Sequence, residues 1–223
     1  MSADENHDVP PTDEKPSLKR IVNAAIMRLQ PQVTGPKAHD QGPARARMAA
    51  LRSGVGRSPG EVPLAWGEVA QEVLPDFPPQ WSYGDQATPE ERAAFTALTF
   101  WALHQQSQER PMHAERLERE YNFGHSVGRL ASAAESKSIK SRFDALLLNS
   151  QGNSTHQHLR SLIQLLRTHE IRVDYAQLAA DLRDLELPQG RRDVLLRWGR
   201  GYAYASSPAP RAAASDNATS TTA

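Results

Sequence analysis

The chain has 223 residues, which is enough for one large domain or two small ones. Lysine and arginine together number 26, as do aspartate and glutamate, so the net charge is zero and does not indicate a partner. The absence of cysteine excludes disulfide bonds, thiolate metal sites and cysteine nucleophiles. Residues 1–16 carry acids and no apolar run, so they do not form a signal peptide, and we expect a cytoplasmic protein.

The first part of the chain predicts an acidic tail followed by a helical bundle. Residues 1–16 are polar and contain prolines, a composition typical of disorder. From Ser17, apolar residues recur at the spacing of one helical face until Pro31 and the Gly-Pro pair that follows it. We expect this helix and three more to form an N-terminal bundle over residues 17–106, with the later helices at residues 43–53, 64–74 and 88–106.

The helix expected at residues 88–106 has strong start signals. Thr88 stands at the N-cap, Pro89 at the first helical position, and Glu91 closes a capping box. The residues that follow are apolar on nearly every side, and such a helix must be covered by several others. Charged residues in its first turn leave too short an apolar run for a membrane span. We therefore predict the central helix of a soluble helical domain.

The rest of the chain predicts a second bundle. Residues 107–125 are charged, broken by proline and weakly periodic, and are expected to be a connector. Residues 126–205 show helical apolar spacing, and residues 206–223 form a low-complexity tail that is expected to be disordered. No period-two run of β-branched residues persists for long enough to predict a strand. The predicted fold is therefore all-α, with two packed helical bundles between disordered N- and C-terminal tails.

The sequence contains no constellation typical of an enzyme. It has no Gly-rich phosphate loop, no HExxH and no GxSxG motif, so no catalytic residue is predicted. His156 and His158 are two positions apart and point about 200° away from each other on a helix, so they cannot chelate a metal from one face. Solvated or capping histidines are favoured instead. We expect no metal site and no cofactor.

Basic residues are segregated along the chain. Four arginines and no acid lie between residues 41 and 60, namely Arg45, Arg47, Arg52 and Arg57. An ordinary solvated helix is the alternative interpretation, but such helices usually intersperse acids with their cations. Further basic clusters comprise Arg129, Lys137, Lys140 and Arg142, the stripe of Arg160 and Arg167, and Arg191, Arg192, Arg197 and Arg200.

Acids gather elsewhere, in a series that comprises Glu61, Glu68, Glu72, Asp76 and Asp85. A neutral chain that sorts its charges in this way predicts one basic face and one acidic face. Arginine suits nucleic-acid backbone because its planar fork pairs two phosphate oxygens. No aromatic residue lies among the four arginines between residues 41 and 60, so we predict phosphate binding without sequence preference and without base stacking.

Five stretches of the sequence occur in a characteristic order. They are ARARMAALRSG, ALTFWALHQQSQERPMH, SVGRLA, HLRSLIQLLRTHEIRVDYAQLAADL and RRDVLLRWGRGY. In this order they resemble the CasB family, the small subunit of the type I-E CRISPR Cascade complex. The resemblance implies an all-helical, non-enzymatic subunit, present in two copies, that contacts the backbone and large subunits of an RNA-guided surveillance complex.

The same resemblance implies a role for the basic face. In the family this face helps to hold the DNA strands opened by guide-RNA pairing, in particular the displaced non-target strand, which stabilises the R-loop. An alternative is a purely architectural subunit whose basic residues contact partner proteins. The candidate nucleic-acid-binding residues are Arg47, Arg52, Arg129, Arg142 and Arg160, which match the family motifs best, and Arg45, Lys137 and Lys140, which rest more on charge segregation.

Overall fold

The protein is described by a computed structural model that covers residues 16–34, 42–114, 122–149 and 153–207. Within these ranges the chain is helical and forms no strand, although an isolated bridge joins His113 to Val173. The all-α prediction is therefore confirmed. None of the described helices is long and apolar enough to cross a membrane. The tails expected at residues 1–16 and 206–223 fall almost entirely outside the described residues.

The helices of the described residues follow in this order. They are α1 (Leu18–Val33), α2 (Gly42–Ser53), α3 (Pro63–Val73), α4 (Pro89–Gln105), α5 (Phe123–Ala134), α6 (Lys137–Leu148), α7 (Asn153–Thr168), α8 (Tyr175–Leu185) and α9 (Pro188–Ser206). Single 3-10 turns at Pro59–Glu61, Leu74–Asp76 and Pro79–Trp81 shape the loops on either side of α3.

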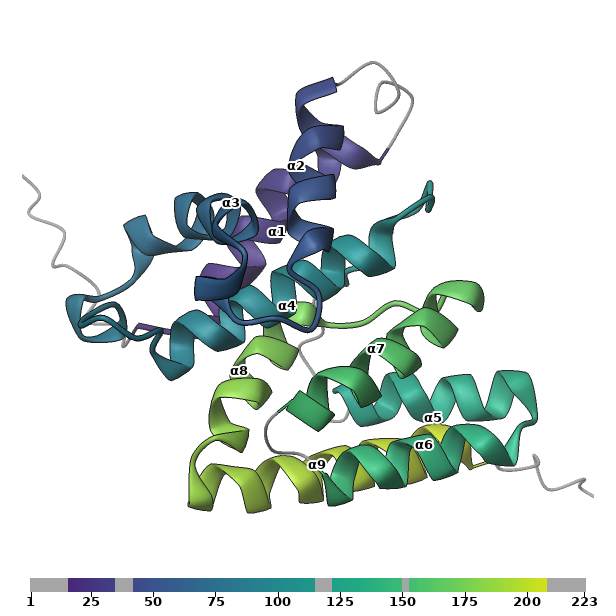
Figure 1. Cartoon of the computed structure of the whole chain (residues 1–223). Helices are drawn as coiled ribbons and strands as arrows, with labels where there is room; N and C mark the ends of the chain where they lie inside the picture. Colours follow the sequence, from purple (N-terminus) through teal and green to yellow (C-terminus); the bar gives the residue numbers. More distant parts are fainter. Residues whose placement is uncertain (1–15, 35–41, 115–121, 150–152, 208–223) are drawn as a thin grey trace, which may run out of the picture.

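Helix α4 lies at the centre of the molecule, as its sequence predicts. The Glu91 backbone N–H donates to the Thr88 hydroxyl at 3.2 Å, and the Thr88 N–H donates to the Glu91 carboxylate at 2.8 Å, so the expected capping box forms. Every side chain from Ala93 to Gln105 is buried. Figure 1 shows the cause: α1, α2 and α3 pack on one side of α4, and α7 and α8 pack on the other.

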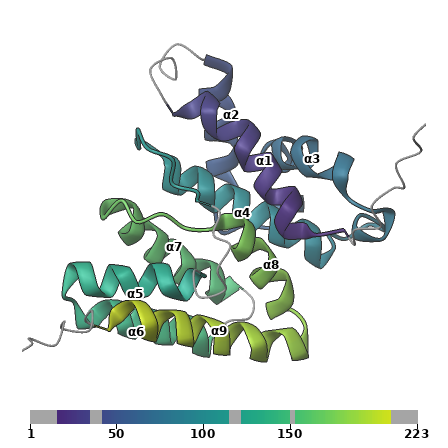
Figure 2. The same ribbon diagram turned by 180° about the vertical axis from the view of Figure 1, so that it is seen from behind.

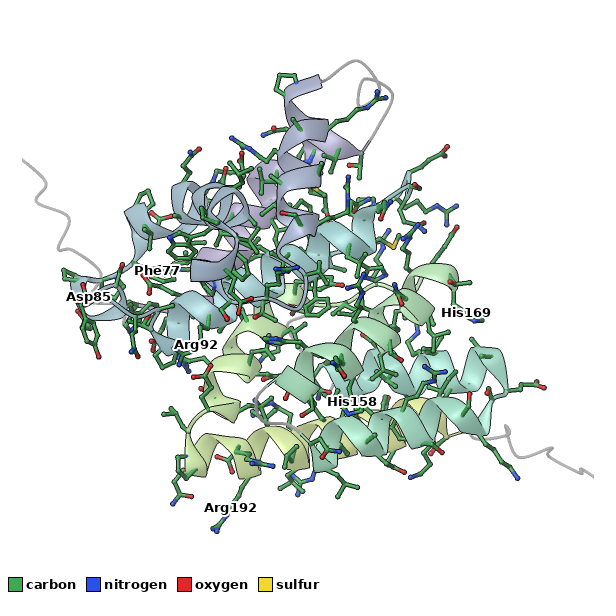
Figure 3. All side chains as sticks on the ribbon, in the orientation of Figure 1. Phe77, Asp85, Arg92, His158, His169 and Arg192 are labelled. Carbon is green, nitrogen blue, oxygen red and sulfur yellow. The ribbon has the colours of Figure 1, made fainter. Side chains whose placement is uncertain are left out.

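The two bundles, α1–α4 and α5–α9, share one continuous apolar core. Helix α8 belongs to the second bundle in sequence, yet it packs against α1 and α4 as well as against α9. At the edge of this seam, Arg92 of α4 binds the carboxylate of Glu186, which follows α8, and this bonding raises the pKa of Arg92. Arg92 is visible at the seam in Figure 3. Apolar packing and an ion pair therefore hold the two halves together.

Helices α5 and α9 run side by side in the same direction (Figure 2). Helix α5 begins within the expected connector because Asn122 caps it, accepting a hydrogen bond from the His125 N–H at 3.3 Å. A Cβ at Gly124 would lie 1.9 Å from the Trp198 carbonyl oxygen, and one at Gly128 would lie 2.5 Å from that of Tyr202. The two glycines therefore permit an approach that any side chain would prevent.

Helix α1 passes through Pro31 and ends at Val33, between this proline and the Gly-Pro pair that the sequence marks as the end of the helix. Proline removes one backbone donor, and the Thr34 N–H still bonds to the Gln30 carbonyl at 3.1 Å, so the last turn stays closed.

Candidate nucleic-acid interface

Arg47 is turned toward α3. Its Nε lies 2.8 Å from Glu68 Oε2, and its Nη1 lies 3.1 Å from Glu72 Oε1. Arg28 of α1 binds the same Glu72 at 3.0 Å and lies 3.9 Å from Asp76. The expectation that this arginine helix lacks acidic partners is therefore wrong at Arg47, because the acids come from a neighbouring helix. Part of the predicted acidic series is neutralised in the same way.

Arg52, at the end of the same helix, has a different environment. It is half-buried, and its pKa is lowered first by burial and then by the charge of Arg167. Arg167 lies in the last turn of α7, so the two repelling arginines come from different bundles. Among the described residues, neither of them pairs with a carboxylate. A bound anion would relieve this repulsion, because both guanidinium groups can donate to it.

Two further arginines lie along α7. Arg160 is exposed and stands seven residues before Arg167, so the two share one side of the helix. Arg142 of α6 donates from Nη1 to the hydroxyl of Ser161, the residue after Arg160, at 2.7 Å. We call Arg52, Arg142, Arg160 and Arg167 the α7 arginine stripe. In Figure 1 α7 crosses the middle of the molecule between α4 and α6, and His158 marks this helix in Figure 3.

Arg167 is held in place by contacts at the end of α7. Its Nη1 lies 3.5 Å from the Gln106 side-chain oxygen, and its backbone carbonyl accepts a hydrogen bond from Gln108 at 3.2 Å. Sequence reasoning placed Arg167 on a stripe with Arg160 but did not select it. The seven-residue spacing between Arg160 and Arg167 was the sequence signal that could have selected Arg167. We add it to the candidate site because its charge lowers the pKa of Arg52.

The other predicted residues lie elsewhere. Arg129 is exposed on α5, Lys137 is exposed at the start of α6, and Arg45 is exposed near the start of α2. Lys140 pairs with Asp144 at 2.6 Å, and this hydrogen bond raises the pKa of the lysine. These four residues lie on α2, α5 and α6 and are not part of the α7 arginine stripe as defined above.

One arginine of α9, Arg197, forms an ion pair with a buried carboxylate. Arg197 lies 2.5 Å from the fully buried carboxylate of Asp181, which also accepts a hydrogen bond from the Trp198 indole at 2.5 Å. Burial raises the pKa of Asp181, while the charge of Arg197 acts in the opposite direction. Arg197 is therefore part of the contact between α8 and α9. Arg192, by contrast, is exposed, as Figure 3 shows.

Two histidines are part of the core. His104 Nδ1 lies 2.8 Å from the Tyr175 hydroxyl, and burial lowers the pKa of His104 to about 3, so its ring is neutral near pH 7. His113 Nδ1 accepts a hydrogen bond from the Tyr175 N–H at 3.2 Å. In the described ranges, no group of three or more histidine or acidic side chains is placed to hold a metal ion.

Comparison with known proteins gives a consistent set of similarities. The model of the family described as CRISPR-associated protein Cse2 matches residues 47–202, a range that includes the whole α7 arginine stripe. The structure of CasB from Thermobifida fusca is 29% identical, with a TM-score of 0.65, and the match covers 83% of this chain and 97% of that one. A comparison with curated protein sequences gives no match.

Two other solved structures share the fold. CasB from Thermus thermophilus is 25% identical, with a TM-score of 0.58 over 84% of this chain and 97% of that one. A chain from a structure described as a CRISPR RNA-guided surveillance complex is 23% identical, with a TM-score of 0.60 over 85% of this chain and 95% of that one.

Proposed function

Because the chain belongs to the Cse2 family of CRISPR-associated proteins, we propose that it is the small subunit of an RNA-guided surveillance complex and holds nucleic-acid backbone on the α7 arginine stripe. The likeness to a chain from a CRISPR RNA-guided surveillance complex supports this assembly. The companions of the subunit are then the backbone and large subunits, the guide RNA that they carry and a second copy of this chain.

The observation that carries the binding role is the environment of Arg52, which is half-buried and whose pKa is lowered first by burial and then by the charge of Arg167. Two cations from different bundles repel each other in a half-buried setting, and neither pairs with a carboxylate among the described residues. Leaving such a pair without a counterion costs stability, and a phosphate group offsets that cost with charge-assisted hydrogen bonds. Arg142 and Arg160 extend the stripe along α7, which suits a phosphate chain better than a single ion.

In the mechanism that we propose, the subunit stabilises the R-loop and catalyses no reaction. Replacing a DNA duplex by an RNA–DNA heteroduplex is nearly balanced in free energy, so contacts to the separated strands decide how far the R-loop opens. We propose that the stripe holds single-stranded DNA, in particular the displaced non-target strand, and that the subunit has no catalytic role. Guanidinium groups that contact phosphates carry no base information, so this binding is independent of sequence.

Salt dependence tests the proposal. The full chain is titrated with a fluorescein-labelled oligothymidylate over a series of salt concentrations. The four phosphate contacts of the stripe contribute about −3 to the log–log salt slope, because each contact on a single strand contributes roughly −0.7. Changing Arg52, Arg142, Arg160 and Arg167 together to glutamine is expected to remove that contribution. Arg192→Gln removes an exposed charge away from the stripe and serves as the control.

The same variants distinguish the architectural alternative. If the four substitutions prevent co-purification with the companion subunits but leave oligothymidylate binding intact, the stripe contacts protein. If the variant assembles normally and its R-loop yield falls at moderate salt, the stripe contacts nucleic acid. Wild-type binding and wild-type R-loop yield in the fourfold variant would refute the proposed function.

A further inference from the structure

An exposed aromatic side chain of α9 is stacked on a histidine of α5, although the two are far apart in the sequence. Tyr204 of α9 is 67% exposed, and its ring is stacked on that of His125 of α5, with centroids 6.1 Å apart and planes 29° from parallel. His125 itself is buried, so it supports one face of the tyrosine ring from below. Much of the Tyr204 ring therefore remains open to solvent in a defined position.

An arginine lies one helical turn from each of the two rings. Arg129 follows His125 by one turn of α5, and Arg200 precedes Tyr204 by one turn of α9. The helices are in close contact at this level, because a Cβ at Gly128 would lie 2.9 Å from the Ala205 Cβ. Both arginines are exposed, and among the described residues neither forms an ion pair.

We propose that Tyr204, backed by His125 and flanked by Arg129 and Arg200, is a stacking position for a base of a single-stranded nucleic acid. The inference rests on the proposed function, because it assumes that the chain binds single strands. An open aromatic face accepts any base, and adjacent guanidinium groups take the phosphates on either side of it. The expectation of binding without base stacking is thereby revised at this position.

The proposal favours nucleic acid over a protein partner for a structural reason. The exposed Arg129 and Arg200 on the same two helices can each pair with two phosphate oxygens, whereas a protein partner would have to present a carboxylate to each of them. A ring with one face supported and cations on both sides matches the pattern of base stacking combined with phosphate binding.

Tyr83 provides a matched control. It is 68% exposed, almost the same as Tyr204, but it lies in the loop before α4, two residues from the exposed Asp85. Figure 3 shows Asp85 at the end of the molecule away from α5. Tyr83→Ala therefore removes an equally exposed ring from an acidic setting.

The experiment compares full-length wild type with Tyr204→Ala, Tyr204→Phe and Tyr83→Ala. The probes are a fluorescein-labelled oligothymidylate and an abasic strand of the same length and charge. We expect Tyr204→Ala to bind the oligothymidylate about five- to tenfold more weakly, the low end of the range for one stacked base, and Tyr204→Phe and Tyr83→Ala to match wild type. On the abasic strand all four proteins are expected to bind equally. A strand carrying 2-aminopurine is expected to be quenched by wild type and less by Tyr204→Ala.

Each other outcome refutes a specific statement. If Tyr204→Ala binds the oligothymidylate like wild type, or loses as much affinity for the abasic strand, the stacking role is wrong. If salt titration shows phosphate contacts but wild type binds both strands equally, the proposed function stands and the stacking position does not. If wild type binds neither strand, the proposed function is wrong and the stacking position is wrong with it. If Tyr204→Ala loses only its companion subunits, the patch is a protein contact.

Discussion

Arg47 and Arg52 lie five residues apart on α2, and we expect their replacement by glutamine to have opposite consequences. The five-residue spacing turns the two side chains about 140° apart on the helix. Arg47 meets Glu68 and Glu72 on α3, whereas Arg52 meets the charge of Arg167. Arg47→Gln is expected to lower stability and spare binding, and Arg52→Gln is expected to spare stability and weaken binding.

The magnitudes follow from these environments. Arg47→Gln removes two ion pairs that are only partly exposed, which costs about 1–2 kcal/mol. For a chain of this size, that corresponds to a fall in melting temperature of roughly 2–8 °C. Arg52→Gln removes a repulsion, so its melting temperature is expected to equal or slightly exceed that of wild type. The loss of one phosphate contact reduces the single-strand salt slope by about 0.7.

Two measurements on each purified variant check this prediction. Thermal unfolding followed by circular dichroism gives the melting temperature, and fluorescence anisotropy with oligothymidylate over a salt series gives the slope. The reasoning is refuted if Arg47→Gln melts with wild type while its salt slope falls as far as that of Arg52→Gln. That result would mean that Arg47 exchanges its carboxylates for phosphates.

Three further predictions concern stability and are measured by urea unfolding. Burial lowers the pKa of His104 to about 3, so between about pH 6.5 and pH 3 only the unfolded chain takes up this proton, and the free energy of unfolding falls as the pH is lowered. His104→Gln is expected to reduce the loss of stability from pH 7 to pH 5 by about 2 kcal/mol. An unchanged loss contradicts this assignment. Gly124→Ala forces α5 away from α9 and is expected to lower the free energy of unfolding by about 3 kcal/mol or more. At Gly199 a Cβ meets nothing within 4 Å, so Gly199→Ala is expected to raise the free energy of unfolding by about 0.5–1 kcal/mol. Equal effects of the two substitutions contradict the close packing of α5 on α9. Asp181→Asn leaves the charge of Arg197 without its buried partner and is expected to lower the free energy of unfolding by about 3–5 kcal/mol. A decrease below about 1 kcal/mol shows that the ion pair contributes little to stability.

Much of the fold could be predicted because its signals are local. Thr88, Pro89 and Glu91 specify the start of α4 within four residues, and the apolar residues around α4 require cover on several sides. Spacing likewise predicted the buried face of α1. Asp174 caps α8 in the same local way, by accepting a hydrogen bond from the Gln177 N–H at 2.8 Å. A helix that is specified by its own residues needs no information from distant parts of the chain.

The candidate site could be predicted only in part. Charge segregation and family resemblance selected Arg160 on α7, Arg142, which donates to Ser161 of α7, and Arg52, whose pKa is lowered in part by the charge of Arg167 of α7. They also selected Arg47, which is held by Glu68 and Glu72. The acids and arginines occur in separate blocks of the sequence, and the packing of α2 on α3 brings part of those blocks together.

The sequence by itself determined which residues share a side of each helix, because 3.6 residues per turn fixes that relation within a single element. Tertiary structure alone decided that Arg52 meets Arg167 and that Tyr204 lies on His125. The physical reason is that helical periodicity sets directions around one axis but not the neighbour found in each direction. That neighbour depends on how closely pairs such as α5 and α9 approach, and glycines at their contact control the distance.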